Sequence, residues 1–447
     1  MNRVSERASN QQTSSINRVI AASSIGTILE WYDFYLFGTT AALAYFTATF
    51  FPDFDPTAAM LAAFSGYAVG FIARPLGGLL FGILGDIYGR KAMLIATVTL
   101  MGAGTFAIGV LPGYAVLGIF STIILVVLRL MQGLSTGGEW GGAALMVVEN
   151  APPNRRGFYS SFVQIGVGGG FILATAIFFG VGAVLPPEAM ESWGWRIPYL
   201  LSIVLLGLGF YIRIRIGETP IFEEVKEERN VERIPILSAF RMHPKEIASA
   251  TGANLTTSAL GSTLYIYGLS YATQQVGIGN QTMLAVLTLT QLFSVAAIIY
   301  AGRLSDRIGR KPVFHAGALS IIILAFPFFM LINTGSIVLV AVAYLLMNLF
   351  GTWSYAVLAA LFSESFDPRV RYTALSVGYQ LGGILGAGLA PLTLLTLYTW
   401  SGTFVSSSLY LIAIAIIGIV SVAVLSVRWS AEDPTKLQPR SSAVQGR

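Results

Sequence analysis

The sequence predicts an all-α membrane protein of twelve transmembrane helices, arranged as two pseudo-symmetric six-helix bundles. Apolar runs recur along the 447 residues, of which 55% are hydrophobic and only 11% charged. Soluble domains carry about 25% charged residues, and a run of about 20 apolar residues crosses the hydrocarbon core of a bilayer. Two further observations support this fold: Lys and Arg are confined to alternate connections, and two motifs recur at about half the chain length.

The expected transmembrane spans follow the apolar runs. Runs of this length favour helices, because a β-barrel would show short strands of alternating polarity. The twelve spans are 19–46, 57–84, 92–111, 114–148, 157–184, 196–215, 246–276, 282–302, 312–333, 336–363, 372–398 and 403–428.

The placement of Lys and Arg predicts the orientation. They occur in the N-terminal tail, in every second connection and in the C-terminal tail, whereas the intervening connections lack them and Arg196 lies at the border of one. Cytoplasmic connections of membrane proteins are enriched in Lys and Arg. Both termini are therefore expected in the cytoplasm, which requires an even number of spans.

One long polar interruption divides the chain, and we interpret it as a linker without a role in the chemistry. Its mixed charges at short spacing favour a surface helix. The chain has no cysteine, and His243 and His315 lie far apart in sequence, so no thiol or metal site is expected. The predicted domains are a cytoplasmic tail at 1–18, a first bundle at 19–215, the linker at 216–245, a second bundle at 246–428 and a second cytoplasmic tail at 429–447.

Two motifs occur once in each predicted bundle. The segment 82–91, which ends in Gly89-Arg90-Lys91, recurs as 302–311, and 149–156 recurs as 364–371 with its Glu, Pro and Arg in register. A loop that only sets topology would explain the cations of the first motif, but it does not require an acid at the same place in both halves. Two related halves of the same orientation are one architecture of transporters that work by alternating access.

Five charged residues fall well inside the spans of the first bundle, away from their ends, and none falls well inside the predicted spans of the second. Each would cost about 2.5–3.5 kcal/mol at the centre of a membrane helix, so they should form ion pairs or line a wet cavity. These residues are Glu30, Asp33, Arg74, Arg129 and Glu139.

Proton coupling is one interpretation of these charges. Glu30 and Asp33 share a helix face, and an Asp33–Arg129 pair would reduce the desolvation cost of both groups. Three acids against two bases leave one carboxylate, which is buried at lowest cost in its protonated form. The predicted proton-coupling residues are Asp33, Glu30, Arg129 and Glu139; static ties between helices are the alternative.

The second bundle has polar stripes in place of charges. Asn254, Ser258 and Tyr265 follow one helix face, and Tyr344 and Asn348 follow another. Polar faces in a lipid environment turn toward protein or water, where they could hold a substrate, although helix–helix contact equally explains any single residue. The predicted substrate-binding residues are Tyr32, Arg74, Gln132, Trp140, Asn254, Ser258, Tyr265, Tyr344 and Asn348.

Several motifs resemble those of the metabolite:proton symporters within the major facilitator superfamily. They are Glu30-Trp31-Tyr32-Asp33-Phe34-Tyr35, Arg74-Pro75-Leu76-Gly77-Gly78, Gly85-Asp86 with Gly89-Arg90-Lys91, Gly137-Gly138-Glu139-Trp140-Gly141-Gly142 and Ser192-Trp193-Gly194-Trp195-Arg196-Ile197-Pro198. The resemblance covers about residues 18–428. It departs from the family pattern at Ile87, where Arg is usual, and at Ser305, which replaces a glycine.

This resemblance implies a central cavity lined chiefly by spans 1, 4, 7 and 10. It also implies a cytoplasmic gate, for which the predicted residues are Asp86, Arg90, Glu149, Arg156, Asp306 and Arg310. Members of the family carry shikimate, 2-oxoglutarate, citrate, or proline and betaine together with protons, and the shikimate type is the most similar. The C-terminal coiled coil of the osmosensing proline/betaine member is missing.

The sequence therefore predicts a proton-coupled symporter of a small organic acid in the bacterial inner membrane. We expect a monomer without cofactor, metal or nucleic-acid partner, whose partners are the substrate, protons and the bilayer. The alternatives are a proton-coupled exporter of drugs or metabolites, a symporter of a zwitterionic osmolyte, and a sensor that binds the metabolite without moving it. A membrane enzyme is disfavoured, because no Ser-His, Cys or metal motif lies near the membrane.

Overall fold

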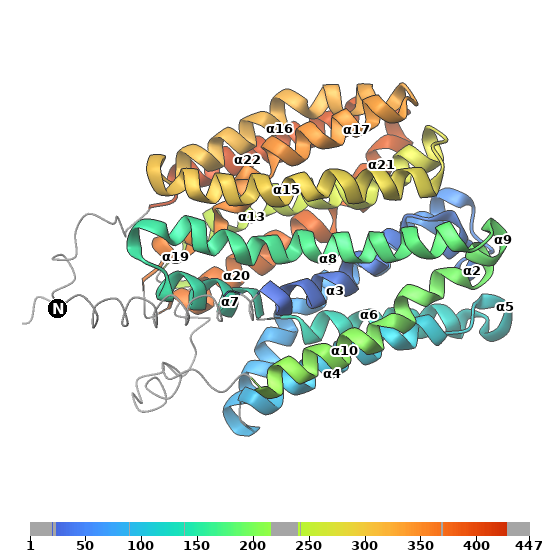
Figure 1. Ribbon diagram of the computed structural model, residues 1–447, viewed down its shortest axis with the longest axis horizontal. Coiled ribbons are helices and arrows are strands. Elements are labelled where there is room, and N and C mark those ends of the chain that lie inside the picture. The colour runs from blue at the N-terminus through green and yellow to red at the C-terminus, as the bar shows by residue number, and fades with distance from the viewer. Residues whose placement is uncertain are drawn as a thin grey trace, which may run out of the picture.

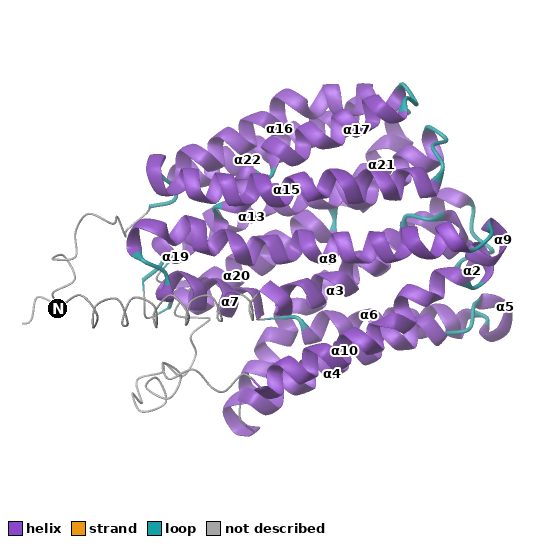
Figure 2. Cartoon of the chain, viewed as in Figure 1, coloured by secondary structure: helices purple, strands orange, loops and turns teal. Residues whose placement is uncertain are grey.

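A computed structural model describes residues 20, 24–88, 90–137, 139–215, 240–241, 243–367 and 370–426. The regular structure in these ranges is helical, and Figure 2 shows the helices joined by short loops. The two predicted tails, most of the predicted linker and the side chains of Asp86 and Arg90 lie outside what the structure describes. We refer to residues 24–215 as the first half and to residues 243–426 as the second half.

The first half contains six membrane-length helical segments. A helix over 24–41 continues into the short α2. The other elements are α2 (Ala44–Phe50), α3 (Pro56–Tyr88), α4 (Arg90–Val110), α5 (Tyr114–Leu117), α6 (Ile119–Ser135), α7 (Glu139–Asn150), the 3₁₀ turn η1 (Pro153–Arg155), α8 (Arg156–Val184), α9 (Pro187–Ser192), the 3₁₀ turn η2 (Gly194–Arg196) and α10 (Ile197–Arg215).

The second half repeats this plan, with π-helical turns inside three of its segments. Its elements are α13 (Pro244–Ser262), the π-turn η3 (Thr263–Tyr267), α14 (Gly268–Ser270), the π-turn η4 (Tyr271–Gln275), α15 (Asn280–Ile308), α16 (Arg310–Asn333), α17 (Ile337–Leu346), the π-turn η5 (Met347–Gly351), α18 (Trp353–Ala356), α19 (Leu358–Ser365), α20 (Arg371–Gly383), the π-turn η6 (Ile384–Gly388), α21 (Ala390–Ser401) and α22 (Val405–Val424).

The prediction of twelve transmembrane helices is confirmed. Among the described residues, eight helices are long and apolar enough to cross a membrane. The other four segments are 24–41, α4, α10 and the segment from α13 to η4. The first and last of these four carry buried polar side chains, and burial among other helices removes the need for an apolar surface toward lipid.

The expected span 114–148 corresponds to the apolar helical stretch Ile119–Asn150, in which α6 ends at Ser135 and α7 begins at Glu139. The backbone at Gly137 approaches α3 so closely that a Cβ atom there would lie 2.1 Å from the Arg74 carbonyl oxygen. Gly137 therefore lets the chain turn against α3.

Equivalent helices pack closely in the two halves, through glycines of the fifth and eleventh spans. A Cβ atom on Gly170 of α8 would lie 2.7 Å from the Tyr32 backbone nitrogen, and one on Gly382 of α20 would lie 2.6 Å from the Thr251 carbonyl oxygen. Small residues allow such backbone contacts between membrane helices. The fifth span thus packs on the first, and the eleventh packs on the seventh.

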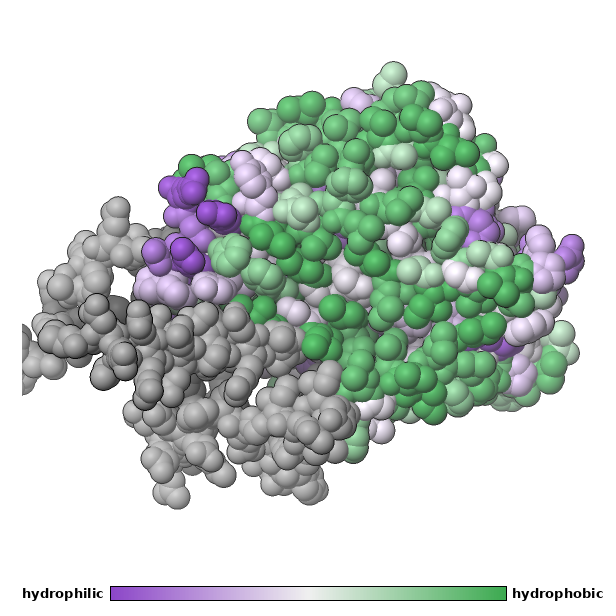
Figure 3. All heavy atoms as spheres, viewed as in Figure 1, coloured by the Kyte–Doolittle hydropathy of each residue, from purple (hydrophilic) through white to green (hydrophobic). Residues whose placement is uncertain are grey.

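The two halves meet along α8 and α15, which lie side by side in Figure 1. Figure 3 shows an apolar band around the middle of the molecule, with polar side chains gathered toward its two ends. We call the end that carries Arg155, Arg310 and Arg371 the basic end, which lies toward the left in Figure 1, and the other the opposite end. This surface is that of a helical membrane protein, whose apolar band faces lipid.

Candidate functional site

A small cavity of about 60 Å³ lies between the two halves, near the middle of the helices that line it. Trp31 and Tyr35 come from the helix over 24–41, and Gln164 comes from α8. The second half supplies most of the lining, from α13, η3, α15, α18, α20 and η6. Span 4 does not contribute, so the expectation of a lining chiefly by spans 1, 4, 7 and 10 is wrong: spans 5, 8 and 11 also line the cavity.

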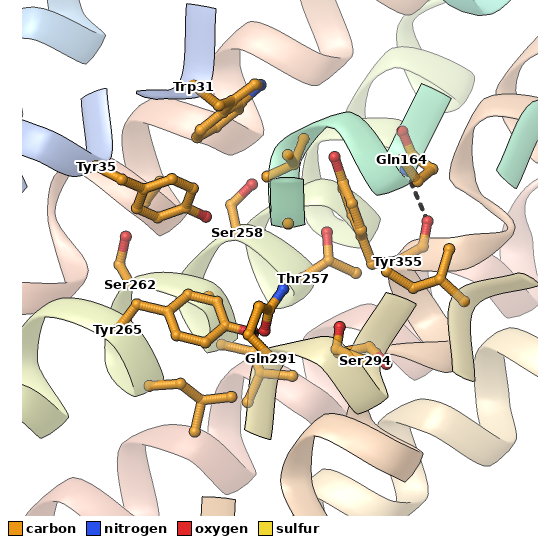
Figure 4. A pocket seen from close by; sticks show the side chains of 18 of the residues that line it. Trp31, Tyr35, Gln164, Thr257, Ser258, Ser262, Tyr265, Gln291, Ser294 and Tyr355 are labelled. Atoms are coloured by element: carbon orange, nitrogen blue, oxygen red, sulfur yellow. Dashed lines mark hydrogen bonds between the residues drawn. The ribbon is translucent and has the colours of Figure 1, made fainter. Parts of the chain in front are cut away.

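None of the residues that line the cavity carries a charge. Its polar groups are hydroxyls and amides, accompanied by aromatic rings. Figure 4 shows Trp31 and Tyr35 on one side of the cavity and Gln291 and Ser294 on the other. Such a surface can donate and accept hydrogen bonds and stack against a flat solute. The polar lining residues are Tyr35, Gln164, Thr257, Ser258, Ser262, Tyr265, Gln291, Ser294, Thr352, Tyr355 and Tyr379.

Two of the predicted substrate-binding residues, Ser258 and Tyr265, line the cavity. The Tyr265 hydroxyl donates to Asn348 Oδ1 at 2.7 Å and also contacts Gln291 Oε1. The Ser258 hydroxyl donates to Asn254 Oδ1 at 3.1 Å. Asn348 and Asn254 thus lie one layer behind the lining and orient it.

Trp140 also lies behind the cavity wall. Its ring stacks on Tyr379 with ring centres 3.6 Å apart, and its Nε1–H donates to Gln164 Oε1 at 2.9 Å. Gln164 Nε2 in turn donates to the Tyr355 carbonyl oxygen of the second half at 2.8 Å, the bond drawn in Figure 4. This chain of contacts joins the two halves on the side of the cavity that faces the basic end.

Two predicted substrate-binding residues lie away from the cavity. The Tyr32 hydroxyl donates to the Pro198 carbonyl oxygen at 2.6 Å and so ties the first helix to α10. Tyr344 is fully buried in the second half, where its ring packs edge-on against Phe328. Tyr344 was placed on a polar stripe by spacing alone, which does not distinguish a stripe that faces a cavity from one that faces another helix.

The charged residues of the first half are buried, with Glu30, Asp33, Arg74 and Arg129 each at most 4% exposed. The structure pairs Glu30 with Arg74, with Oε1 and Nη2 3.7 Å apart. Asp33 and Arg129 interact electrostatically, but they form no ion pair in the described structure. The predicted direct pair is therefore wrong in this conformation.

A row of polar side chains leads from Arg129 toward Asp33 instead. Arg129 Nη1 donates to Gln132 Oε1 at 2.7 Å, and Gln132 Nε2 donates to the Thr105 hydroxyl at 2.6 Å. The Thr105 hydroxyl donates to the Met101 carbonyl oxygen at 3.1 Å and lies beside the Asp33 carboxylate. Gln132, predicted to bind substrate, thus lies between two predicted proton-coupling residues and does not line the cavity. Glu139 begins α7, where it is partly exposed.

The predicted gate residues with described side chains gather at the basic end. The Asp306 carboxylate accepts hydrogen bonds from the backbone N–H groups of Gly157 and Phe158, both at 2.8 Å, and so caps α8 from the other half of the molecule. Arg310 Nη1 lies 2.7 Å from Asp306 Oδ1. An acid at a helix N-terminus is favourable, because it accepts from free N–H groups and opposes the helix dipole.

Two further residues complete this cluster, and sequence reasoning did not assign them to the gate. Glu364 accepts from Arg310 at 3.1 Å, and Arg371 lies 3.7 Å from Glu149 of the first half. Arg156 lines the same hollow and interacts electrostatically with Glu364. Glu149 and Arg156 are repeated as Glu364 and Arg371. The Glu of each motif copy therefore lies near the Arg of the other copy. The repeat was the signal that could have identified them.

The halves also touch on the other side of the cavity. Gln274 Nε2 donates to the Ala42 carbonyl oxygen at 3.1 Å, and Ile266 packs against Gly38. Contacts between the halves thus lie on both sides of the cavity.

Two protein-family models match this chain, one for each half. Residues 19–250 match the family described as "Sugar (and other) transporter", and residues 251–445 match "Major Facilitator Superfamily". A solved structure of a proton:xylose symporter, XylE, bound to 6-bromo-6-deoxy-D-glucose, superposes with a TM-score of 0.73 at 17% identity, covering 92% of this chain and 95% of that chain. That likeness concerns the fold.

Curated relatives are considerably more similar in sequence. The shikimate transporter of Escherichia coli (strain K12) is 38% identical over 404 residues, which cover 90% of this chain and 92% of that protein. The inner membrane metabolite transport protein YhjE of the same strain is 39% identical over 418 residues, which cover 92% and 94%. This chain therefore belongs to the major facilitator superfamily of membrane transporters, in the branch of metabolite:proton symporters.

Proposed function

We propose that this protein imports a small polar organic acid together with protons, by alternating access between its two halves. The observation that carries the proposal is an uncharged, hydroxyl-lined cavity between the halves, bordered on one side by the buried acids and arginines of the first half. The similarity to a shikimate transporter supports a hydroxylated acid as the substrate class. The bundles would span 19–215 and 246–428, and the protein would act as a monomer.

Asp33 is the proposed proton carrier, with Glu30 and Glu139 as further candidates. A neutral Asp33 interacts less strongly with Arg129, and the row of polar side chains through Thr105 and Gln132 would transmit that change to α6. The contacts at the basic end would then break when the protein opens to the cytoplasm. Coupling requires that proton and substrate together favour one conformation over the other.

The proposal includes a location in the bacterial inner membrane, with both termini in the cytoplasm. One similar protein is named an inner membrane protein, and the distribution of Lys and Arg supports a cytoplasmic position for both termini by the positive-inside rule. The basic end is then the cytoplasmic end, and Glu149, Arg156, Asp306 and Arg310 hold the cytoplasmic gate.

Uptake by proteoliposomes containing only the purified protein tests the proposal. Radiolabelled shikimate, 2-oxoglutarate, citrate, proline and glycine betaine are offered with and without an inward proton gradient. Gradient-driven accumulation of an acid is expected, whereas binding without uptake would indicate a sensor and expulsion of solute would indicate an exporter. Asp33→Asn should abolish accumulation while sparing exchange, and full accumulation by that variant would contradict the assignment of Asp33.

A zwitterionic osmolyte is the second candidate substrate. Trp31, Tyr35 and Tyr265 present aromatic rings to a cavity without charged side chains, and aromatic faces attract quaternary ammonium groups. Accumulation of glycine betaine in preference to the acids would favour this candidate.

A further inference from the structure

The Arg74 guanidinium is buried with unused hydrogen-bond donors. Its Cζ lies 3.8 Å from the ring centre of Phe34, 4.5 Å from that of Phe71 and 4.9 Å from that of Trp31. Its Nε and Nη2 have no hydrogen-bond partner among the described residues, and Glu30 Oε1, at 3.7 Å, is beyond hydrogen-bond distance. Buried donors normally have partners, so this group has capacity for another acceptor.

A single ring separates Arg74 from the cavity. Trp31 lines the cavity and lies against the Arg74 guanidinium, and its own Nε1–H has no partner in the described part of the chain. The cavity lining contains no cation, although a carboxylate is held most strongly by an arginine. Arg74 is therefore a cationic group that could reach the cavity if the Trp31 side chain moved.

We propose that the substrate carboxylate displaces Trp31 and binds the free donors of Arg74, and that Glu30, released from Arg74, takes up one proton. This inference rests on the proposed function and specifies its substrate as a carboxylate anion. The carboxylate oxygens accept hydrogen bonds from Arg74 Nε and Nη2. One Glu30 oxygen forms an O–H bond with a proton delivered by water from the open side of the protein.

Charge balance makes the two events depend on each other. Glu30 and Arg74 together are neutral, and an added anion would leave one uncompensated negative charge in a buried site. Such a charge costs several kcal/mol, and a proton on Glu30 removes it. The charged and titratable groups near Glu30 are Asp33 on the same helix, Arg74 on α3, Tyr355 on α18 and Tyr379 on α20. Arg129 of α6 lies against the Phe34 ring, which Arg74 also contacts.

Binding measurements with shikimate and its neutral methyl ester test this exchange. In wild-type protein, the shikimate affinity should fall about tenfold for each unit of rising pH, because one proton binds with the anion. Glu30→Gln, which mimics the protonated acid, should bind shikimate with an affinity that no longer varies with pH. Glu188→Gln, an exposed acid at the opposite end, is the control and should keep the pH dependence.

Variants of Arg74 test the recognition of the carboxylate. Arg74→Gln should lower the affinity for shikimate about 100-fold and leave that for methyl shikimate unchanged. The double variant Arg74→Gln with Glu30→Gln should prefer the ester to the acid, and misfolding cannot produce this reversal of preference.

Three outcomes would overturn the inference: equal loss of acid and ester binding in Arg74→Gln, an unchanged pH dependence in Glu30→Gln, or wild-type uptake limited to neutral or zwitterionic solutes. Asp33→Asn separates the inference from the proposed function. That variant should keep the pH dependence of binding while losing accumulation, so either assignment can fail without the other.

Discussion

The two halves share one plan and differ in their chemistry. The first half holds the buried charges Glu30, Asp33, Arg74 and Arg129, whereas the second half supplies most of the uncharged cavity lining. In the described structure, the π-helical turns also belong to the second half alone. The comparison shows that two bundles of one plan differ in content: the first buries ionisable side chains, and the second presents uncharged polar groups to the cavity.

The π-turns show how the second half shapes the cavity. Leu264 and Tyr265 of η3 and Ala387 of η6 line it, and Thr352 follows η5 directly. A π-turn inserts one residue into a helix and reorients the side chains beside it, and such turns are frequent at functional sites. The first half instead keeps regular helices around its buried charges, which need fixed partners.

The largest expected effect comes from Arg129, at the centre of the charged half. Arg129→Gln should lower proton-driven accumulation more than 100-fold, because it removes the cation that interacts with Asp33 and with Gln132. Proteoliposome uptake measures the loss, and retained counterflow shows that the variant is folded. Accumulation at the wild-type level would end the assignment of proton chemistry to the first half.

The next effect concerns the interface at the basic end. Asp306→Ala removes two hydrogen bonds to the start of α8 and one of the two carboxylate partners of Arg310. Uptake should fall about tenfold, because the closed interface loses these charge-assisted bonds while Glu364 still holds Arg310. Protection of an engineered cysteine at this interface from a thiol reagent reports directly how often the two halves separate at the basic end. Uptake and protection both within twofold of wild type would show that this cap does not hold the halves together.

A smaller effect is expected in the uncharged half. Tyr265→Phe removes a cavity hydroxyl that bonds to Asn348, and the KM should rise about fivefold to tenfold, equivalent to about 1–1.4 kcal/mol. The ratio of protons to solute should not change. A change in that ratio would mean that proton coupling extends into the second half.

The smallest effect should come from the Glu149–Arg371 pair. The oxygen–nitrogen distance is 3.7 Å, and the Glu149 side chain is 47% exposed. Exposed ion pairs contribute about 0–1 kcal/mol, so a double-mutant cycle with Glu149→Gln and Arg371→Gln should give a coupling free energy of unfolding below about 1 kcal/mol. A larger value would assign this pair a leading part in closing the basic end.

The spans could be predicted from sequence because a lipid environment imposes a length and a composition on every crossing helix. Part of the charged cluster at the basic end was also visible in the sequence, because a repeated acid within a basic loop needs a reason beyond topology. Local spacing served less well where a side chain has several possible partners. Arg129 bonds to Gln132 on its own helix and to the Gly66 carbonyl of α3, a choice that depends on how closely α3 and α6 approach.

The cavity residues Tyr35, Gln164, Gln291 and Tyr379 escaped prediction for a related reason. Tyr35 stood out only as part of a family motif, and the other three lie on helices for which no polar stripe was predicted. Their common location follows from the packing of six segments drawn from both halves. The break at Gly137 and the π-turns are likewise responses to neighbouring helices, which the local sequence does not encode.

The contact between α8 and α15 runs through the whole thickness of the molecule. It joins Gly157 to Gly302, Gly168 to Gln291, Thr175 to Thr288 and Gly182 to Gln281. Two bodies that share such a line can rotate about it with little sliding, so this seam is a candidate rotation axis. The Thr175 and Thr288 hydroxyls lie 2.8 Å apart, so a pair of cysteines at these positions could cross-link the two halves at this axis. Because the chain contains no native thiol, no other residue would form a disulfide.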